Sequence, residues 1–307
     1  MKNITPMLSL LVIKDIASKC GFDLCGVAKC QNFTTDRLFF DKWIDKGYAA
    51  NLEYLKRNRD KRADASQLVE DAKSVIVCAV SYKNRYSTGY HSNCHQKIAS
   101  YALTTDYHTT IKEMLRNLFS KLKQIYPTIS GRIFVDSAPI FEKRYAVEAG
   151  LGWIGKQSLL ITPQFGSFVL LGVAVITDEC DQYDVPLKVK GCGECRRCID
   201  ACPNGAIKER HIDTRLCISR ATIESEGSEQ IPLHGWVFGC DECQSCCPYN
   251  AKTEFARNSL FTPTFDPAEI DWHKISEAEF SLHFATTPLS RSSLKRIEEN
   301  LGSTYSL

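Results

Sequence analysis

The sequence predicts a mixed α/β (α+β) domain, then a small cysteine-rich domain and a short helical tail. Three observations predict this fold class. Over roughly residues 1–180, segments of helical periodicity alternate with short apolar segments typical of buried strands. Over 181–255 both patterns thin out and cysteines take over, with nine of the chain's fifteen cysteines between Cys192 and Cys247. Over 256–307 helical periodicity returns, so we expect a short C-terminal helical segment that packs on the core.

Helices are expected where apolar residues recur every three or four positions. The first covers residues 8–20 and ends at Gly21. A later one is stopped by Pro127. We also expect Ser137 to cap a helix with Pro139 in its first turn and Gly150 at its end. The other helical segments are 36–60, 109–126, 276–284 and 290–300.

Strands are expected where short apolar runs lie between turn signals. The clearest is SVIVCAVS, residues 74–81, whose continuous apolar character predicts a strand buried on both faces. The other expected strands are 132–135, 158–161 and 167–177.

Composition excludes several classes of protein. A formal net charge of +2 is too small for a strongly basic nucleic-acid protein, and 44% hydrophobic residues suffice for a core. The short apolar run 7–13 has no cleavage site or twin-arginine signal, and no run approaches the length of a membrane span. We therefore expect a cytoplasmic protein with no membrane partner, whose cysteines are metal ligands or reduced thiols rather than disulfides.

The first cysteine run is Cys192-x2-Cys195-x2-Cys198-x3-Cys202-Pro203. This is the bacterial ferredoxin pattern, in which three cysteines hold one 4Fe–4S cluster and the fourth reaches across to another. Thiolates suit the soft iron–sulfur core. A pair of structural zinc sites is the alternative, but zinc ribbons do not need a third evenly spaced cysteine or a repeated Cys-Pro ending. The run predicts a bacterial two-cluster ferredoxin-like domain.

The second cysteine run is less regular. It comprises Cys217, then Cys240-x2-Cys243-x3-Cys247-Pro248, with Cys246 beside Cys247. Both runs end in Cys-x3-Cys-Pro, so we match Cys247 to Cys202. Cys246 in place of Cys247 stays open as an alternative. The crossed pairing assigns Cys192, Cys195, Cys198 and Cys247 to cluster 1, and Cys202, Cys217, Cys240 and Cys243 to cluster 2.

Two stretches before the cysteines are candidates for a second site that receives electrons. Asp136 follows an expected strand, where ligands of α/β folds gather, and an acid there donates a proton if burial raises its pKa. The alternative is that Asp136 only caps a helix. Gly150–Gly155 allows close approach of a cofactor, or else forms only a helix end and turn. His108 is a candidate ligand or proton carrier, with a structural histidine as the alternative.

Several motifs together resemble one enzyme family. They are YALTTDYH, VDSAPIFEKR, AGLGWIGKQSLLITP, GSFVLLG, the first cysteine run, Arg215-x-Cys217-Ile218-Ser219 and Gly239-Cys240-Asp241-Glu242-Cys243. In combination and order they look like epoxyqueuosine reductase, the cobalamin-dependent iron–sulfur enzyme of the last step of queuosine synthesis in tRNA. The resemblance covers about residues 10–300. It implies a cobalamin-binding domain before the ferredoxin-like domain.

The resemblance also implies roles for individual residues. The family's proton-donating aspartate matches Asp136, and its crossed cluster ligation matches the assignment above. The expected cobalamin contacts are Gln157, Ser158, Thr162 and Ser167, with Tyr107 and His108. This chain departs from the family in having Gln157 for the usual Asn, Ser137-Ala138 for the usual Thr-Gly, and the additional Cys246.

The implied reaction reduces the epoxide of epoxyqueuosine in a tRNA anticodon loop to an alkene, with electrons from the clusters through cobalamin. We expect an external low-potential electron donor and a monomer. Many members continue into a helical-repeat extension that helps hold RNA; this chain stops at Leu307, so we expect part of that contact to be missing or replaced. A cobalamin-dependent reductive dehalogenase, a non-enzymatic electron-transfer ferredoxin and a zinc-dependent RNA-binding module are the alternatives.

Basic side chains are the candidate phosphate contacts. For any single one of them, a solvated charged surface is the alternative. The candidates are Arg57, Arg59, Lys61, Arg62, Lys83, Arg85, Arg291, Lys295 and Arg296.

Overall fold

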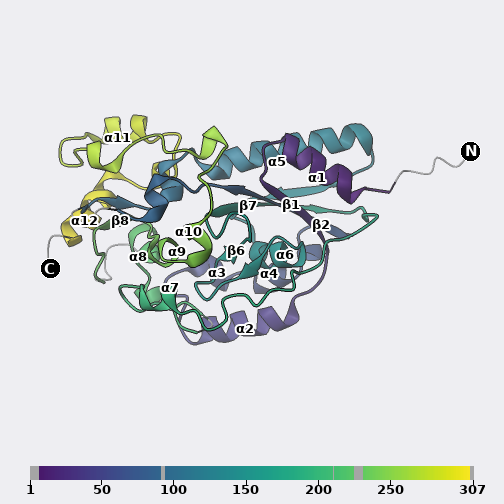
Figure 1. Cartoon of the computed structure of the whole chain (residues 1–307), viewed down its shortest axis with the longest axis horizontal. Helices are drawn as coiled ribbons and strands as arrows, with labels where there is room; N and C mark the ends of the chain where they lie inside the picture. The colour runs from purple at the N-terminus through teal and green to yellow at the C-terminus, as the bar shows by residue number, and fades with distance from the viewer. Residues whose placement is uncertain (1–6, 91–93, 210, 225–230, 305–307) are drawn as a thin grey trace, which may run out of the picture.

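A four-stranded sheet lies at the centre of the computed structural model, which describes residues 7–90, 94–209, 211–224 and 231–304 (Figure 1). The strands run in the order β1-β2-β7-β4, and all neighbours are antiparallel. The expected mixture of helices and strands is confirmed, in an α+β arrangement. The strands are β1 (Leu24–Lys29), β2 (Ser74–Ser81), β7 (Val169–Ile176) and β4 (Gly131–Phe134).

Helices cover both faces of this sheet (Figure 1). All eight residues of β2 are buried, as expected of 74–81. On one face, alternate β2 side chains pack against α1 (Leu10–Lys19) and α5 (Tyr107–Ile125). On the other they pack against α6 (Glu142–Glu148). This alternation follows from the two-residue side-chain period of a strand.

The expected helix over 36–60 is wrong as a single element. The segment forms α2 (Thr34–Asp45), α3 (Glu53–Lys56) and α4 (Arg59–Ala63). Gly47, Ala50 and Asn58 between them have φ values of 74°, 48° and 54°. A left-handed residue cannot continue a right-handed helix, so the periodicity survives while the helix breaks.

Two further elements differ from expectation. Ser137 does not cap a helix: α6 begins at Glu142 with Phe141 as its N-cap residue. Strand β1 was not expected, because Gly26 weakens its apolar pattern. The structure gives the reason for this glycine, since an added Cβ would lie 2.1 Å from the carbonyl oxygen of Ala149.

The glycine-rich segment and the cysteine-rich region are built from short elements. A two-stranded sheet pairs β5 (Trp153–Ile154) with β6 (Leu160–Ile161). A second pairs β3 (Lys97–Ile98) in parallel with β8 (Trp236–Phe238), and so joins the N-terminal part to the cysteine-rich region. The short helices of the cysteine-rich region are α7 (Arg197–Asp200), η4 (Thr214–Leu216), α8 (Ile218–Ile223), α9 (Glu242–Ser245) and α10 (Pro248–Ala251), and those of the N-terminal part are η1 (Ala65–Gln67), η2 (Arg85–Thr88) and η3 (Ser100–Leu103).

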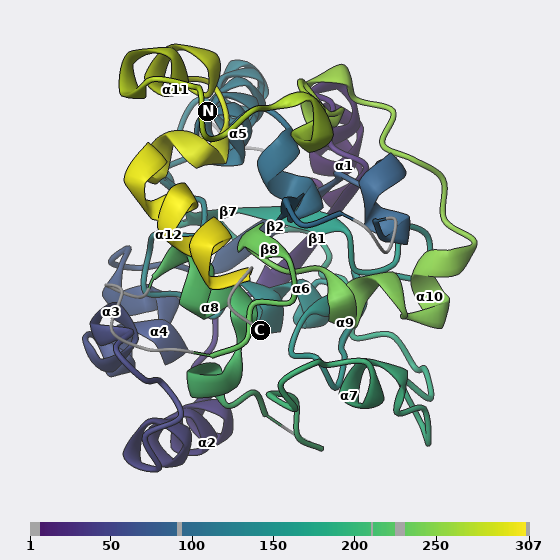
Figure 2. The same ribbon diagram turned by 90° about the vertical axis from the view of Figure 1, so that its left-hand side faces the viewer.

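The C-terminal segment packs on this junction (Figure 2). Trp272, Phe280 and Phe284 form a buried aromatic group against Ile98 and Phe238. The amide of Asn300 donates to the carbonyls of Thr222 and Val237. The tail therefore shares one core with both preceding regions. Its elements are η5 (Ser259–Phe261), η6 (Pro267–Glu269), α11 (Glu277–His283), η7 (Pro288–Arg291) and α12 (Leu294–Thr304).

Within the described ranges, none of the helices combines the length and the apolar character that crossing a membrane requires.

Candidate functional site

The carboxylate of Asp136 lies just beyond the end of β4 and is held by the first turn of α5. The Tyr107 hydroxyl donates to Asp136 Oδ2 at 2.7 Å, and His108 Nε2 lies 3.3 Å from the same oxygen. The two rings stack on each other with centroids 4.0 Å apart. The structure thus brings together three residues that the sequence singled out separately.

A second carboxylate stands behind His108. Asp106 is the N-cap residue of α5, accepts from the His108 amide, and lies 2.7 Å from His108 Nδ1. Arg291 of the C-terminal segment is 3.5 Å from the other oxygen of Asp106. His108 therefore lies between two carboxylates. The sequence did not single out Asp106, because a helix-capping role explains an aspartate at this position equally well.

The charges of this group are coupled. Burial lowers the pKa of His108, but the hydrogen bonds to Asp106 and Asp136 outweigh it, so the pKa lies above its ordinary value. The hydrogen bond from His108 outweighs burial at Asp136 and holds the pKa of that carboxyl below its ordinary value. Burial by itself raises the pKa of Asp136, but the net shift is downward, opposite to the shift that favours a proton donor. Both shifts favour the state in which the proton is on His108 and not on Asp136.

Asp136 is accessible to solvent. Its side chain is 61% exposed, yet it is surrounded closely enough by protein for burial to affect its pKa. Tyr54, Arg62 and Glu224 stand around it, and each interacts electrostatically with Asp136. Burial, and then the negative charges of Glu224 and Asp136, raise the pKa of Tyr54 to about 12. Arg62, expected as a phosphate contact, lies at this site instead of on an open surface.

The glycine-rich stretch lines a hollow of about 430 Å³ together with Leu187, Val189, Lys190, Gly191, Cys192 and Glu209. Lys143 Nζ donates to the Ser158 carbonyl at 2.6 Å and interacts electrostatically with Asp136, which places the hollow beside the Asp136 group. Two buried donors, Trp153 Nε1 and Gln157 Nε2, have no hydrogen-bond partner among the residues that the structure describes. Since orphaned buried donors are rare, these fit an additional bound group.

The expected cobalamin contacts fall into four groups. Among these six described residues, Ser158 is the one that lines the hollow. Gln157 is buried with its amide nitrogen unpartnered. Thr162 and Ser167 have hydroxyls committed to protein, the first to Gly166 O and the second to Gln244 Oε1. Tyr107 and His108 face Asp136.

Four cysteines from the two runs interact around the first run. Cys198 interacts electrostatically with Cys192, Cys195 and Cys247, and Cys247 with Cys192 and Cys195. Burial, followed by these neighbours, raises the pKa of both Cys198 and Cys247. A set of thiolates that repel one another in this way suits a positively charged iron core.

A second set of thiols lies around Cys217. Cys217 interacts with Cys202 and Cys240, and Cys243 interacts with Cys217 and Cys240. Burial is the main cause of the raised pKa of Cys217. Cys246 lies near Cys198 and Cys247, and its sulfur is 3.6 Å from the Cys243 carbonyl oxygen. No three His, Cys, Asp or Glu side chains converge on a single-ion position in the part of the chain that the structure describes.

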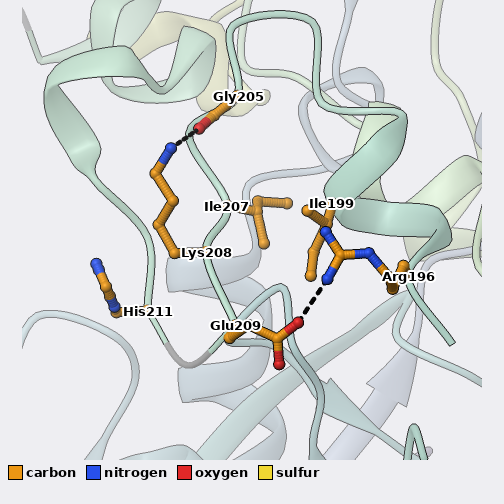
Figure 3. Close-up of a pocket in the computed structure, with 7 residues that line it drawn as sticks. All are labelled: Arg196, Ile199, Gly205, Ile207, Lys208, Glu209 and His211. Carbon is orange, nitrogen blue, oxygen red and sulfur yellow. Dashed lines mark hydrogen bonds and ion pairs between the residues drawn. The ribbon is translucent and has the colours of Figure 1, made fainter. Parts of the chain in front are cut away.

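A larger hollow of about 610 Å³ lies against the first cysteine run (Figure 3). Ile199 and Ile207 line it with apolar surface, and Arg196 Nη1 meets Glu209 Oε1 at 2.5 Å across it. Lys208 Nζ donates to the Gly205 carbonyl at 2.8 Å. Most of its polar side chains are therefore already paired.

The side chains expected as phosphate contacts differ in their exposure to solvent and in whether they are already paired with a carboxylate. Lys83 is wrong as a candidate, because its side chain is buried and Nζ donates to the Asn250 carbonyl. Arg59, Arg85 and Arg296 are paired with Asp41, Asp266 and Glu299. Arg57 and Lys61 are exposed on the 53–63 segment, which also carries Tyr54 and Arg62.

Comparison with known proteins gives two family models that match separate parts of the chain. Residues 62–137 match the family described as epoxyqueuosine reductase QueG, DUF1730. Residues 191–250 match the 4Fe–4S double cluster binding domain. The second match supports iron–sulfur clusters in the cysteine-rich region.

Curated relatives match nearly the whole chain. The epoxyqueuosine reductase of Cyclobacterium marinum is 38% identical over 297 residues, covering 94% of each chain. That of Leadbetterella byssophila is 36% identical over 305 residues, covering 94% of this chain and 96% of its own. A crystal structure of epoxyqueuosine reductase with an epoxyqueuosine-modified tRNA-Tyr stem loop has the same fold, with a TM-score of 0.81 at 24% identity over 96% of this chain and 80% of that one.

Proposed function

This chain belongs to the epoxyqueuosine reductase family, and on that premise we propose that it reduces epoxyqueuosine to queuosine in the anticodon loop of a tRNA. The observation that supports it best is the Asp136 carboxylate, which Tyr107 and His108 hold beside the hollow between the glycine-rich stretch and Cys192. No observation on this chain favours a dehalogenase.

The reaction requires two electrons and two protons. Both C–O bonds of the epoxide break, the two carbons become an alkene, and the oxygen leaves as water. An alkoxide is a poor leaving group, so a proton must reach the oxygen as the first bond breaks. A positioned acid typically contributes about 10²–10⁴-fold to such a step.

We assign that proton transfer to Asp136 and its supply to His108. The raised pKa of His108 favours its protonated form, and Nε2 is 3.3 Å from Asp136 Oδ2. Asp136 receives that proton from His108 and passes it to the epoxide oxygen, which leaves as water after the second C–O bond breaks and a second proton arrives. Asp106 keeps the imidazole oriented through Nδ1.

The residues around the hollow fit cobalamin, with Gln157 and Ser158 as the contacts best supported by burial and position. When bound, cobalamin supplies the low-potential electrons for cleavage of the C–O bond. We propose the two thiol sets as ligands of 4Fe–4S clusters fed by an external donor, with Cys192, Cys195, Cys198 and Cys247 on cluster 1 and Cys202, Cys217, Cys240 and Cys243 on cluster 2.

We further propose the division into a catalytic region 1–180, a ferredoxin-like region 181–255 and a tail 256–307. The aromatic group of the tail and Arg291 support a role for the tail at the site, because Arg291 reaches Asp106.

Turnover tests the function directly. Protein reconstituted anaerobically with iron, sulfide and cobalamin is mixed with a chemical reductant and a stem loop carrying epoxyqueuosine. We expect a nucleoside product lighter by one oxygen atom in mass spectrometry. Absence of conversion by protein that carries both clusters and cobalamin would contradict the proposal, and halide release from organohalides would favour the dehalogenase alternative.

Arg57 and Lys61 are the proposed phosphate contacts. Replacing both with glutamate is expected to weaken binding of the stem loop and to lower the slope of log affinity against log salt by about 1.4, since each phosphate contact on single-stranded nucleic acid contributes about 0.7. Binding measured by fluorescence anisotropy at several salt concentrations checks this.

Lys123→Glu is the matched control for that measurement. It lies on α5 sixteen residues after Tyr107, about 24 Å along the helix axis at 1.5 Å per residue. An equal change of slope in the control would mean that general charge, and not this segment, governs binding.

A further inference from the structure

Two residues that border the site adopt the left-handed backbone conformation without being glycine. Asp136 has a φ of 59° and Ser158 a φ of 62°. Such conformations are strained and persist only where surrounding contacts enforce them. Something in the fold must therefore hold both loops.

Consecutive side chains at the start of α6 make these contacts. Glu142 Oε1 accepts from the Asp136 amide at 2.8 Å, and Lys143 Nζ donates to the Ser158 carbonyl at 2.6 Å. Behind them Tyr145 and Ala146 are buried in the core that α6 shares with the sheet. The start of α6 is therefore held in place by the core. Glu142 lies six residues after Asp136, so its contact with the Asp136 amide is not part of a helix-capping pattern.

The surroundings of Glu142 are charged on several sides. Asp136 faces it from the preceding loop, Lys143 from its own helix, His108 from α5 and Arg62 from α4. Burial, and then the charge of Asp136, raise the pKa of Glu142 to about 8. Near neutral pH the group is therefore mostly uncharged, and its carbonyl oxygen still accepts a hydrogen bond.

We infer that Glu142 is a positioning residue for the proposed reduction: its side chain holds the Asp136 backbone in the left-handed conformation that directs the Asp136 carboxylate toward Tyr107 and His108. This inference rests on the proposed function. Residues of α5 hold the Asp136 carboxylate, and Glu142 of α6 holds the Asp136 backbone. Loss of either contact is therefore expected to free the loop between β4 and α6.

Two variants separate positioning from other roles. Glu142→Ala removes the acceptor, and Glu142→Gln keeps a carbonyl oxygen in its place. We expect Glu142→Ala to lower kcat by up to about 10²-fold, the effect of misplacing a reacting group by about 1 Å, with KM nearly unchanged. Glu142→Gln should restore kcat to near the wild-type value. Glu148→Ala, on the same helix and paired with Arg144 at 2.6 Å, is the control and should leave kcat unchanged.

Amide hydrogen exchange supplies a readout that needs no turnover. The peptide containing Asp136 should lose protection in Glu142→Ala and keep it in Glu142→Gln. Unchanged protection and kcat in Glu142→Ala would overturn the inference. A kcat of Glu142→Gln as low as that of Glu142→Ala would also overturn the inference, because it would mean that the reaction needs the proton of Glu142 and not only its carbonyl oxygen. Failure of wild-type turnover counts against the proposed function alone, because the exchange result stands by itself.

Discussion

Asp136→Asn is expected to reduce turnover of the epoxyqueuosine stem loop by about 10²–10⁴-fold, the usual contribution of a positioned acid. An amide has nearly the shape of the carboxyl group and can still accept from Tyr107, but it delivers no proton to the leaving oxygen. Iron content and the cluster absorbance should stay at wild-type values, because Asp136 belongs to neither set of thiols. Single-turnover assays on reconstituted protein measure the effect.

The same assay across pH tests the supply of protons by His108. The pKa of His108 is raised, so its protonated form persists above the ordinary value and is lost as pH rises through the raised one. Turnover limited by this proton should therefore fall as pH rises through that range, while the lowered pKa of Asp136 matters only in acid. Asp15→Asn, which alters a surface ion pair with Lys19, is the control.

Near-normal turnover by the Asp136→Asn variant would contradict the assignment of Asp136 as the proton donor.

Cys247→Ser is expected to remove one cluster and abolish turnover, whereas Cys246→Ser should leave both clusters in place. Cys247 is buried and interacts with Cys192, Cys195 and Cys198. Serine does not supply the soft thiolate that the iron–sulfur core prefers. Iron should fall from about eight to about four atoms per chain in the first variant, since each cluster holds four.

Cys246→Ser is the matched control, because Cys246 is the adjacent residue and lies near the same thiols. Anaerobic iron and sulfide determinations, with electron paramagnetic resonance of the reduced protein, distinguish the variants. Loss of a cluster in Cys246→Ser with both retained in Cys247→Ser would reverse the assignment of these two residues.

Much of this protein is predictable from local sequence. The strand 74–81 is determined by a continuous apolar run, because such a run is stable only when both faces are covered. The cysteine spacing indicates the cluster domain, since two-residue gaps keep successive thiolates on one side of a turn. Asp136 after a strand is also visible in the sequence, although its importance comes from the resemblance to a family.

Other features of the fold and the site depend on contacts between residues far apart in the sequence. The sequence shows neither that Asp106 and Arg291 meet at His108 nor that Glu142 holds Asp136, because each side chain has an equally good local role as cap, surface charge or helix start. In the sequence Lys83 looks like a surface cation, but in the structure its Nζ donates to the carbonyl of Asn250 in α10. The predicted helix over 36–60 failed because periodicity reports which face is apolar and does not report left-handed residues.

The sequence alone determined the kinds of chemistry in this protein: thiolates in ferredoxin spacing, an acid at the end of a strand and a glycine-rich segment. Only the tertiary structure decided how these groups are coupled. Protonation depends on distances of a few ångströms between charges, as at His108 between two carboxylates. Those distances come from contacts between segments far apart in the chain, which local patterns do not encode.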